Sequence, residues 1–133
     1  MKIVAFLIAV VPVLVSCTNS SRQIAMWNQD ESKTKPYLPS EVISKEGLAK
    51  DSIYVQGFLI DAFENTAIYD DKFAAENHEF DKALWVRMAD YRGLEPYAGK
   101  SVVVKGALDL SNKGHMDVFG GEIRPIDLFL LNR

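Results

Sequence analysis

The chain has 133 residues, of which 48% are apolar, so it has enough apolar side chains for one domain with a packed core. Its 15 Lys and Arg residues are scattered among 18 Asp and Glu residues, which argues against nucleic acid as a partner. Cys17 is the only cysteine, so no disulfide can form within the chain and the fold must depend on its core.

The first sixteen residues have the features of an export signal. Lys2 is followed by an apolar run over residues 3–15, and the small Ser16 comes next. This run is too short to cross a bilayer as a helix, which needs about 20 residues. We therefore predict that residues 1–16 are a signal peptide. Its removal takes away Lys2 and leaves 14 basic against 18 acidic residues.

The end of this segment, Leu14-Val15-Ser16-Cys17, resembles the lipobox of bacterial lipoproteins. The resemblance implies that Cys17 becomes the first residue and carries acyl chains such as palmitate, which hold the protein on a membrane without a spanning helix. A cleaved secretory signal with an unmodified cysteine is the alternative. Thr18 is not acidic, and in a Gram-negative source this favours the outer membrane, with the protein facing the periplasm.

Residues 17–39 are predicted to be the lipidated cysteine and a flexible tether, because residues 18–39 are mostly polar and contain two prolines. A flexible chain of that length spans about 25 Å root-mean-square. The apolar segment Ile24-Ala25-Met26-Trp27 interrupts the polar pattern. Docking of this segment on the domain, on a partner or on lipid headgroups remains open.

The remaining residues, 40–133, are predicted to form one β domain. Apolar alternation and turn residues predict strands over residues 53–61, 67–69, 83–88, 101–110 and 121–131. Short helical elements are expected over residues 44–50, with Ser44 as N-cap, and over residues 70–77 and 91–98.

Three residues are expected to interrupt the strand pattern. Gly57 and Gly106 fall in the middle of strands, where small barrels place bulges or bends. Pro125 shifts the apolar phase of the last strand, so a bulge is expected there, with Ile126, Leu128 and Leu130 in a new register. Five strands with a helical element between the third and the fourth predict an all-β fold, a small five-stranded Greek-key (OB-fold-like) barrel with short helices.

The chain resembles small bacterial OB-fold-like lipoproteins and periplasmic proteins of uncharacterised function. The segments that carry this resemblance are 54–59, 67–69, 97–106, 113–116 and 120–123. The resemblance covers residues 42–131 and consists of fold positions. It therefore implies a fold and a compartment, and it carries no catalytic residue to this chain.

Tyr69, Trp85 and Arg87 are the candidate ligand face. Because alternate residues of strand 83–88 point into the barrel, Trp85 and Arg87 point outward, and Tyr69 joins them if its strand pairs alongside. This is the side of an OB barrel where ligands usually bind, and an aromatic ring beside a cation suits a sugar or a peptide. The alternative is that Trp85 covers a barrel end or the returning tether.

The sequence gives little support for a catalytic site or a metal site. A metal site could be drawn from His115, Asp117 and Glu122 with His78-Glu79, but the spacing matches no ligand signature, and a loop histidine that bonds the turn is preferred. No Gly-x-Ser-x-Gly motif is present, and adjacent Asp70-Asp71 suits a helix start. We expect no enzyme, no metal and no cofactor.

The sequence thus predicts a lipid-anchored envelope binding module that recognises a protein or a cell-envelope polymer. The alternative is a structural or assembly component of an envelope protein complex without a small-molecule ligand, in which a barrel edge pairs with another chain. A saturable ligand favours the first function, and stoichiometric co-purification favours the second.

Overall fold

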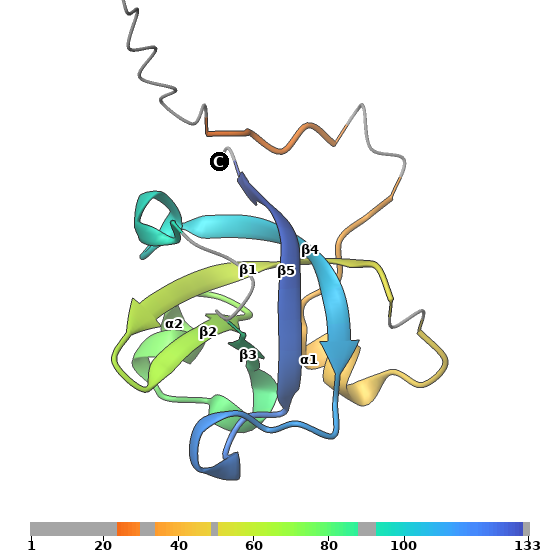
Figure 1. Cartoon of the computed structure of the whole chain (residues 1–133), viewed down its shortest axis with the longest axis vertical. Coiled ribbons are helices and arrows are strands. Elements are labelled where there is room, and N and C mark those ends of the chain that lie inside the picture. Colours follow the sequence, from red (N-terminus) through yellow and green to blue (C-terminus); the bar gives the residue numbers. More distant parts are fainter. Residues whose placement is uncertain (1–23, 30–33, 49–50, 88–92, 132–133) are drawn as a thin grey trace, which may run out of the picture.

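The strands lie close to the positions that the apolar alternation predicts. The computed structural model describes residues 24–29, 34–48, 51–87 and 93–131, so the predicted signal peptide, Cys17 and Met88 lie outside the described residues (Figure 1). In chain order the elements are α1 (Pro39–Ser44), β1 (Ile53–Ala62), β2 (Asn65–Tyr69), α2 (Lys72–Glu76), the 3-10 helix η1 (Phe80–Lys82), β3 (Leu84–Val86), the 3-10 helix η3 (Glu95–Tyr97), β4 (Ser101–Asp109), the 3-10 helix η4 (His115–Asp117) and β5 (Gly121–Leu130).

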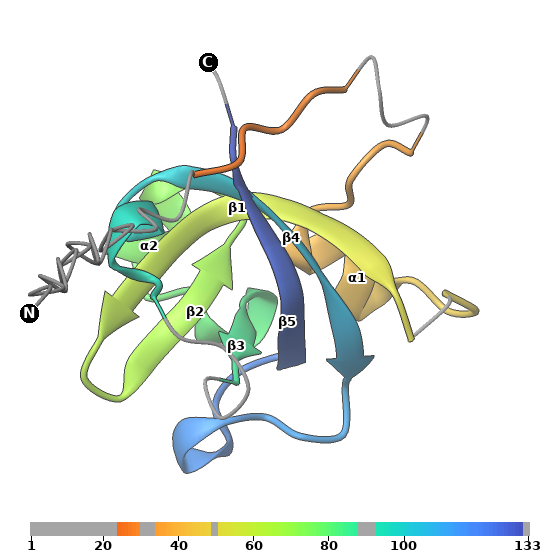
Figure 2. The same cartoon turned by 45° about the horizontal axis from the view of Figure 1, so that its top comes forward.

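The five strands close into a barrel in the order β1-β2-β3-β5-β4 (Figures 1 and 2). Neighbouring strands are antiparallel, apart from β3 and β5, which run parallel. The first half of β1 pairs with β4 and its second half with β2, so this strand closes the sheet on itself. The predicted five-stranded Greek-key (OB-fold-like) barrel is confirmed.

β1 changes partner at Gly57. Gly57 pairs with Val102 of β4, and the next residue, Phe58, is the first that also pairs with β2, opposite Tyr69. A Cβ atom on Gly57 would collide with the carbonyl oxygen of Tyr69, so glycine is required for this close approach. The ladders on both sides of β1 run without a register shift, so Gly57 marks a close approach rather than a bulge.

The bulge expected at Pro125 lies at the next residue. Consecutive residues of β4 pair with Pro125 and with Asp127, which leaves Ile126 as the extra residue of β5. The register is new after Pro125, as expected, but Ile126 is 54% exposed as the extra residue, whereas Leu128 is buried. Because proline has no N–H to donate, the ladder is interrupted beside it.

The helix predicted to start at Ser44 is wrong, because α1 ends at this residue. Pro39 lies in the first turn, where a missing N–H costs nothing, and the Glu41 carboxylate accepts the Leu38 N–H at 3.1 Å. Val42 is fully buried and joins the barrel core. Along the described parts of the chain, no helix is long and apolar enough to span a membrane.

A second, smaller core lies on the outside of the barrel, between β2 and α2. As predicted, a helix starts after Asp71, whose carboxylate accepts the N–H of Ala74 at 2.8 Å. The outward side chains of β2 are covered by the apolar side of α2. The buried residues of this core are Ala67, Tyr69, Ala74, Ala75, Ala83 and Phe119.

Other short elements complete the barrel. Within the predicted helical segment 91–98, the described part forms η3, and Leu94 and Tyr97 enter the barrel core from it. Tyr37 extends the edge of β1: its N–H donates to the Tyr54 carbonyl at 2.9 Å, and its own carbonyl accepts the Gln56 N–H at 2.8 Å. The barrel core is therefore covered in part by the segment before β1 and by the segment between β3 and β4.

The apolar segment that interrupts the predicted tether docks on the domain. The Leu130 N–H donates to the Ala25 carbonyl at 2.9 Å, and the Trp27 N–H donates to the Leu130 carbonyl at 2.8 Å. The Trp27 ring lies 5.2 Å from that of Tyr54 and 5.4 Å from that of Phe129 between ring centroids. Of the three docking alternatives, contact with the domain is therefore the one observed, and the rest of the tether stays a prediction.

Candidate functional site

The outer face of β3 lies between two loops, one joining β1 to β2 and the other joining β4 to β5. Trp85, in the middle of β3, pairs with Ala67 of β2 and with Glu122 of β5. Its strand neighbours Leu84 and Val86 are in the barrel core, so the Trp85 side chain lies on the outside. We call this surface the β3 face, made of Glu64, Trp85, Arg87, His115, Glu122 and Arg124.

Trp85 lies beneath the loop that joins β4 to β5 and is half-buried. The His115 ring is stacked on it at 6.3 Å between centroids and 25°, and the Phe119 ring lies 5.2 Å away. A Cβ atom on Gly114 would lie 2.5 Å from Trp85 Cγ, so the loop backbone lies directly against the indole. Trp85 therefore holds the β4–β5 loop in place, and because this loop covers part of its ring, the ring is less accessible to a ligand than an exposed tryptophan.

His115 and Glu64 join the two loops that flank the face. His115 Nε2 lies 3.2 Å from Glu64 Oε2, a contact that becomes an ion pair when the histidine is protonated. Glu64 has φ 59° and Met116 has φ 55°, a left-handed conformation that is rare for residues other than glycine. The neighbouring side chains Phe63 and Met116 are 91% and 78% exposed. Two unusual turns thus present two large apolar side chains to solvent.

Two arginines flank one buried carboxylate on the same face. Arg87 Nε lies 3.8 Å from Glu122 Oε1, and Arg124 Nε lies 3.6 Å from Glu122 Oε2. The Glu122 side chain is 2% exposed, while those of Arg87 and Arg124 are 42% and 47% exposed. Within the described ranges, Oε2 of Glu122 is buried without a hydrogen-bond partner. The Glu122 carboxylate therefore offsets the charge of both guanidinium groups, but these contacts are too long to be hydrogen bonds.

The register explains why these arginines lie together. Val86 pairs with Ile123 in the parallel ladder, and the Arg87 N–H donates to the Ile123 carbonyl at 3.0 Å. Arg87 and Arg124 therefore occupy the next pair of positions, where two like charges repel each other. Their closest contacts with Glu122 use Nε, and the partly exposed guanidinium groups carry further N–H donors of the kind that suit an anionic group.

Asp109 borders this pair from β4, opposite Glu122. The pKa of Asp109 is lowered, first by the hydrogen bond that the Ser111 hydroxyl donates at 2.6 Å, then by the Ser111 N–H, and to a smaller extent by attraction to Arg124. Arg124 is therefore attracted by two carboxylates, those of Glu122 and Asp109. Among the described residues, Arg87 is paired with Glu122.

Tyr69 does not line the exposed face, so this part of the predicted ligand site is wrong. It lies on the outer side of β2 but is fully buried in the small core under α2. Its hydroxyl lies 2.7 Å from Asn65 Oδ1, to which it donates. Burial raises the pKa of Tyr69, and the hydrogen bond to Asn65 partly offsets this effect. The strand pattern predicts its direction but not the helix that covers it.

The residues of the possible metal site are not brought together. His115 contacts Glu64, Glu122 lies between the arginines, and the His78 ring lies 5.4 Å from that of Phe80. Among the residues that the structure describes, no three His, Cys, Asp or Glu side chains are grouped so that they could hold a metal ion.

Sequence reasoning missed Glu64 and Arg124 as members of the face, together with the exposed Phe63 and Met116. The available signals were an apolar residue inside the turn after the first strand and a methionine in the glycine-containing loop 111–120. Neither signal shows that the two loops meet.

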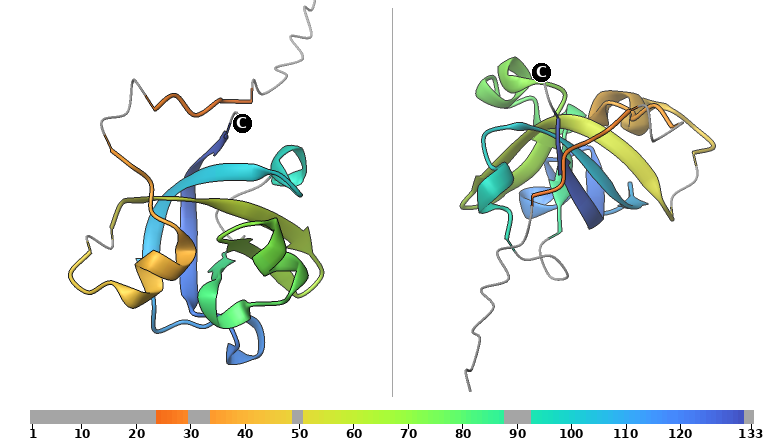
Figure 3. Two further views of the ribbon diagram at one scale, coloured as in Figure 1. Left: turned by 180° about the vertical axis from the view of Figure 1, so that it is seen from behind. Right: turned by 90° about the horizontal axis from the view of Figure 1, so that it is seen from above.

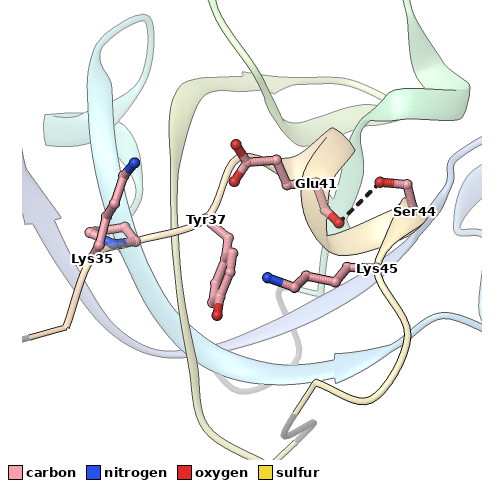
Figure 4. A pocket seen from close by; sticks show the side chains of 6 residues that line it. Lys35, Tyr37, Glu41, Ser44 and Lys45 are labelled. Atoms are coloured by element: carbon pink, nitrogen blue, oxygen red, sulfur yellow. Dashed lines mark hydrogen bonds between the residues drawn. The ribbon is translucent and has the colours of Figure 1, made fainter.

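A separate hollow of ≈ 510 Å³ lies beside α1 (Figure 4). The Lys45 ammonium lies 5.0 Å from the centre of the Tyr37 ring, and the Ser44 hydroxyl donates to the Glu41 carbonyl at 3.2 Å. Figure 4 shows that the Glu41 carboxylate and the Lys45 ammonium do not converge on one point. We therefore take the β3 face, rather than this hollow, as the candidate site.

The fold and the site together define a class, a small closed OB-fold-like barrel with two linked loops beside an arginine pair. Comparison with models of protein families, with curated proteins and with solved structures finds no match. The argument for a function therefore comes from the residues of this chain.

Proposed function

We propose that this protein is a lipid-anchored module of the bacterial envelope that binds a protein partner through the β3 face and the two loops beside it. The observation that carries the proposal is the exposure of Phe63 and Met116 on loops joined by the contact between Glu64 and His115.

Exposed aromatic and methionine side chains favour a protein as the partner. Aromatic residues, Met and Arg are enriched in protein interfaces, and buried aromatic and Arg side chains supply much of their binding energy. Phe63 is almost fully exposed at the tip of the β1–β2 connection, where it adds nothing to the core. The link between the loops holds both apolar side chains in place before binding, which reduces the entropy lost on association.

Arg87 and Arg124 give the partner a second requirement. Two neighbouring, partly exposed guanidinium groups suit a carboxylate, which accepts paired hydrogen bonds from arginine. A partner segment that carries an Asp or Glu side chain next to an apolar side chain satisfies both parts of the surface. The charge pair then mainly determines specificity, while the apolar contacts supply affinity.

The anchor is supported by the resemblance of residues 14–17 to a lipobox after an apolar segment typical of export signals, which implies acyl chains on Cys17. Several acyl chains are needed for stable attachment, because one chain gives only reversible binding. In a Gram-negative source, Thr18 favours the outer membrane, with the barrel in the periplasm.

Photo-crosslinking from the exposed phenylalanines tests the binding face. A photoreactive phenylalanine analogue at Phe63 is expected to give discrete adducts in the native membrane. The same analogue at Phe73, which is 69% exposed on α2, is the matched control and is expected to give none of these adducts. Equal adducts from both positions would contradict the proposal.

Charge substitutions then test the arginine pair in the Phe63 crosslinking background. Arg87→Ala with Arg124→Ala is expected to reduce the adduct about ten-fold, the loss expected for a binding contribution of about 1.4 kcal/mol. Lys72→Ala with Lys82→Ala removes two exposed cations from elsewhere and is expected to leave the adduct unchanged. An adduct that survives the arginine substitutions would exclude the pair as a contact.

The crosslinked product also separates the alternative functions. Protease-sensitive adducts are expected, whereas adducts that resist protease and are released by glycan hydrolysis would indicate an envelope polymer. An assembly component that pairs through a barrel edge would first have to displace Tyr37 or Met26, which form bridges with β1 and β5. Adducts from positions 26 and 37, rather than from position 63, would support that alternative.

A further inference from the structure

The docked segment before the barrel also determines how the domain faces its membrane. We infer that residues 24–27, here called the strap, hold one end of the barrel against the bilayer and turn the β3 face away from it. The inference rests on the proposed function, because it requires acyl chains on Cys17. The bilayer-facing surface consists of Ile24, Met26, Lys100, Leu130 and Leu131.

The strap is attached to the barrel by both backbone and side chain. Met26 forms a parallel bridge with Leu130, which provides the two backbone hydrogen bonds described above. The Trp27 ring packs between Tyr54 and Phe129, so the attachment does not depend on the bridge alone. The strap therefore moves with the folded domain.

Docking shortens the connection to the anchor. Seven residue steps separate Cys17 from Ile24, and their fully extended reach is about 25 Å. A folded domain of about 100 residues has a radius of gyration of about 13 Å, which corresponds to a body about 33 Å across. The connection is therefore too short for the anchor to lie beneath the far end of the barrel.

The surface beside the strap has the chemistry of a membrane contact. Ile24 is 40% exposed and Met26 is 46% exposed. Met26 also borders a shallow hollow of ≈ 370 Å³, lined in addition by Phe58, Gly99, Lys100, Ser101, Leu130 and Leu131. Apolar side chains beside an exposed lysine suit the boundary between acyl chains and anionic headgroups.

The β3 face lies toward the opposite end of the molecule. In Figures 1 and 2 residues 24–29 (orange) lie at the top, beside the end of β5, while the loop with η4 lies at the bottom. The view from above in Figure 3 shows the same segment in front of the barrel. A barrel held by its strap end thus presents the loop with η4, which carries the exposed Met116, away from the bilayer, where a partner protein can reach it.

Two methionines provide a matched pair of probe positions. Acylation of Cys17 leaves no other thiol in the chain, so Met26→Cys and Met116→Cys each add one site for a polarity-sensitive fluorophore. The lipidated full chain is inserted into vesicles of phosphatidylethanolamine and phosphatidylglycerol. The reference is the same labelled chain with Cys17→Ser, labelled selectively because no second cysteine remains, and mixed with the same vesicles.

We expect the membrane to protect the label at position 26 from an aqueous quencher by a factor of about three or more relative to the reference. The label at position 116 is expected to change by less than about 1.5-fold. In the lipidated chain, Trp27→Ala is expected to leave flotation with the vesicles intact and to abolish the protection at position 26, because it releases the strap.

Flotation separates failure of the anchor from failure of the orientation. A chain that does not float with the vesicles overturns both the anchor and the orientation. A chain that floats with the label at position 116 protected, or with neither label protected, overturns the orientation alone. Protection at position 26 that appears without vesicles and rises with protein concentration assigns the surface to a second copy, which also overturns it.

Discussion

Replacement of Gly114 by alanine tests whether the β4–β5 loop is held in place by its contact with Trp85. Gly114 has φ 66° and ψ −153°, a backbone conformation that is open essentially to glycine alone. The new Cβ atom would lie 2.5 Å from Trp85 Cγ and 2.7 Å from Trp85 Cβ, which are not the flexible end of a side chain. Gly114→Ala therefore combines backbone strain with a steric collision.

The two costs can be separated with a matched glycine. Backbone strain in a rare conformation costs about 1–3 kcal/mol, and an extra methyl group in a packed site costs about another 1–3 kcal/mol. Gly99 has φ 69°, but a Cβ atom there would meet nothing within 4 Å. Gly99→Ala therefore carries backbone strain without a collision, so a larger loss for Gly114→Ala reflects the collision with Trp85 together with the backbone strain particular to Gly114.

Thermal and urea unfolding provide the measurement. Each kcal/mol shifts the Tm of a domain of this size by about 4–8 °C, so Gly114→Ala is expected to melt about 4–24 °C below Gly99→Ala. If the loop moves instead of transmitting the strain, the Trp85 emission is expected to shift to the red in a Trp27→Phe background, because His115 no longer covers the indole. Equal Tm values with unchanged Trp85 emission would refute the contact between loop and indole.

Burial raises the pKa of Tyr69 above its ordinary value of 10.0, so its contribution to stability is complete below that pH and is lost as the pH rises through the folded pKa. Urea unfolding from about pH 8 to about pH 11 should therefore lose more stability for the native chain than for Tyr69→Phe, and equal slopes would contradict this. Trp27→Ala is expected to lower the free energy of unfolding by about 1–3 kcal/mol, since a half-buried ring loses less than a core tryptophan. A chain that starts at Pro39 should still unfold cooperatively but at a lower Tm than one that starts at Ile24, and a Tm equal to that of the longer chain would show that the strap adds no stability. Cys17→Ser is expected to abolish labelling by a palmitate analogue and to leave the product soluble or unprocessed; a variant that still labels and pellets with membranes would end the lipid-anchor proposal.

The strands could be predicted from the sequence because side-chain direction in a strand is a local property. By the period of two, Val102, Val104 and Leu108 share one side of their strand, and all three are in the barrel core. The same alternation places Trp85 on the outside of β3, between two core residues. A period of two in the sequence is sufficient for these statements, since it does not depend on which strand lies alongside.

Helix position was less well determined by local signals. Ser44 has the chemistry of an N-cap, and Pro39 has that of a first helical residue, so the sequence permits a helix on either side of Ser44. The observed helix is the one that places Val42 in the barrel core. Burial of this side chain against the closed barrel therefore decides between two locally acceptable helices.

Exposure within the candidate site depended on long-range packing. Tyr69 takes the predicted outer side of β2, yet α2 covers it, and Trp85 points outward beneath a loop from the other end of the chain. Glu64 and His115 meet only because the barrel closes and brings the two loops together. The sequence thus determined which way the side chains point, whereas the tertiary structure decided which remain exposed, because exposure depends on what distant segments pack above them.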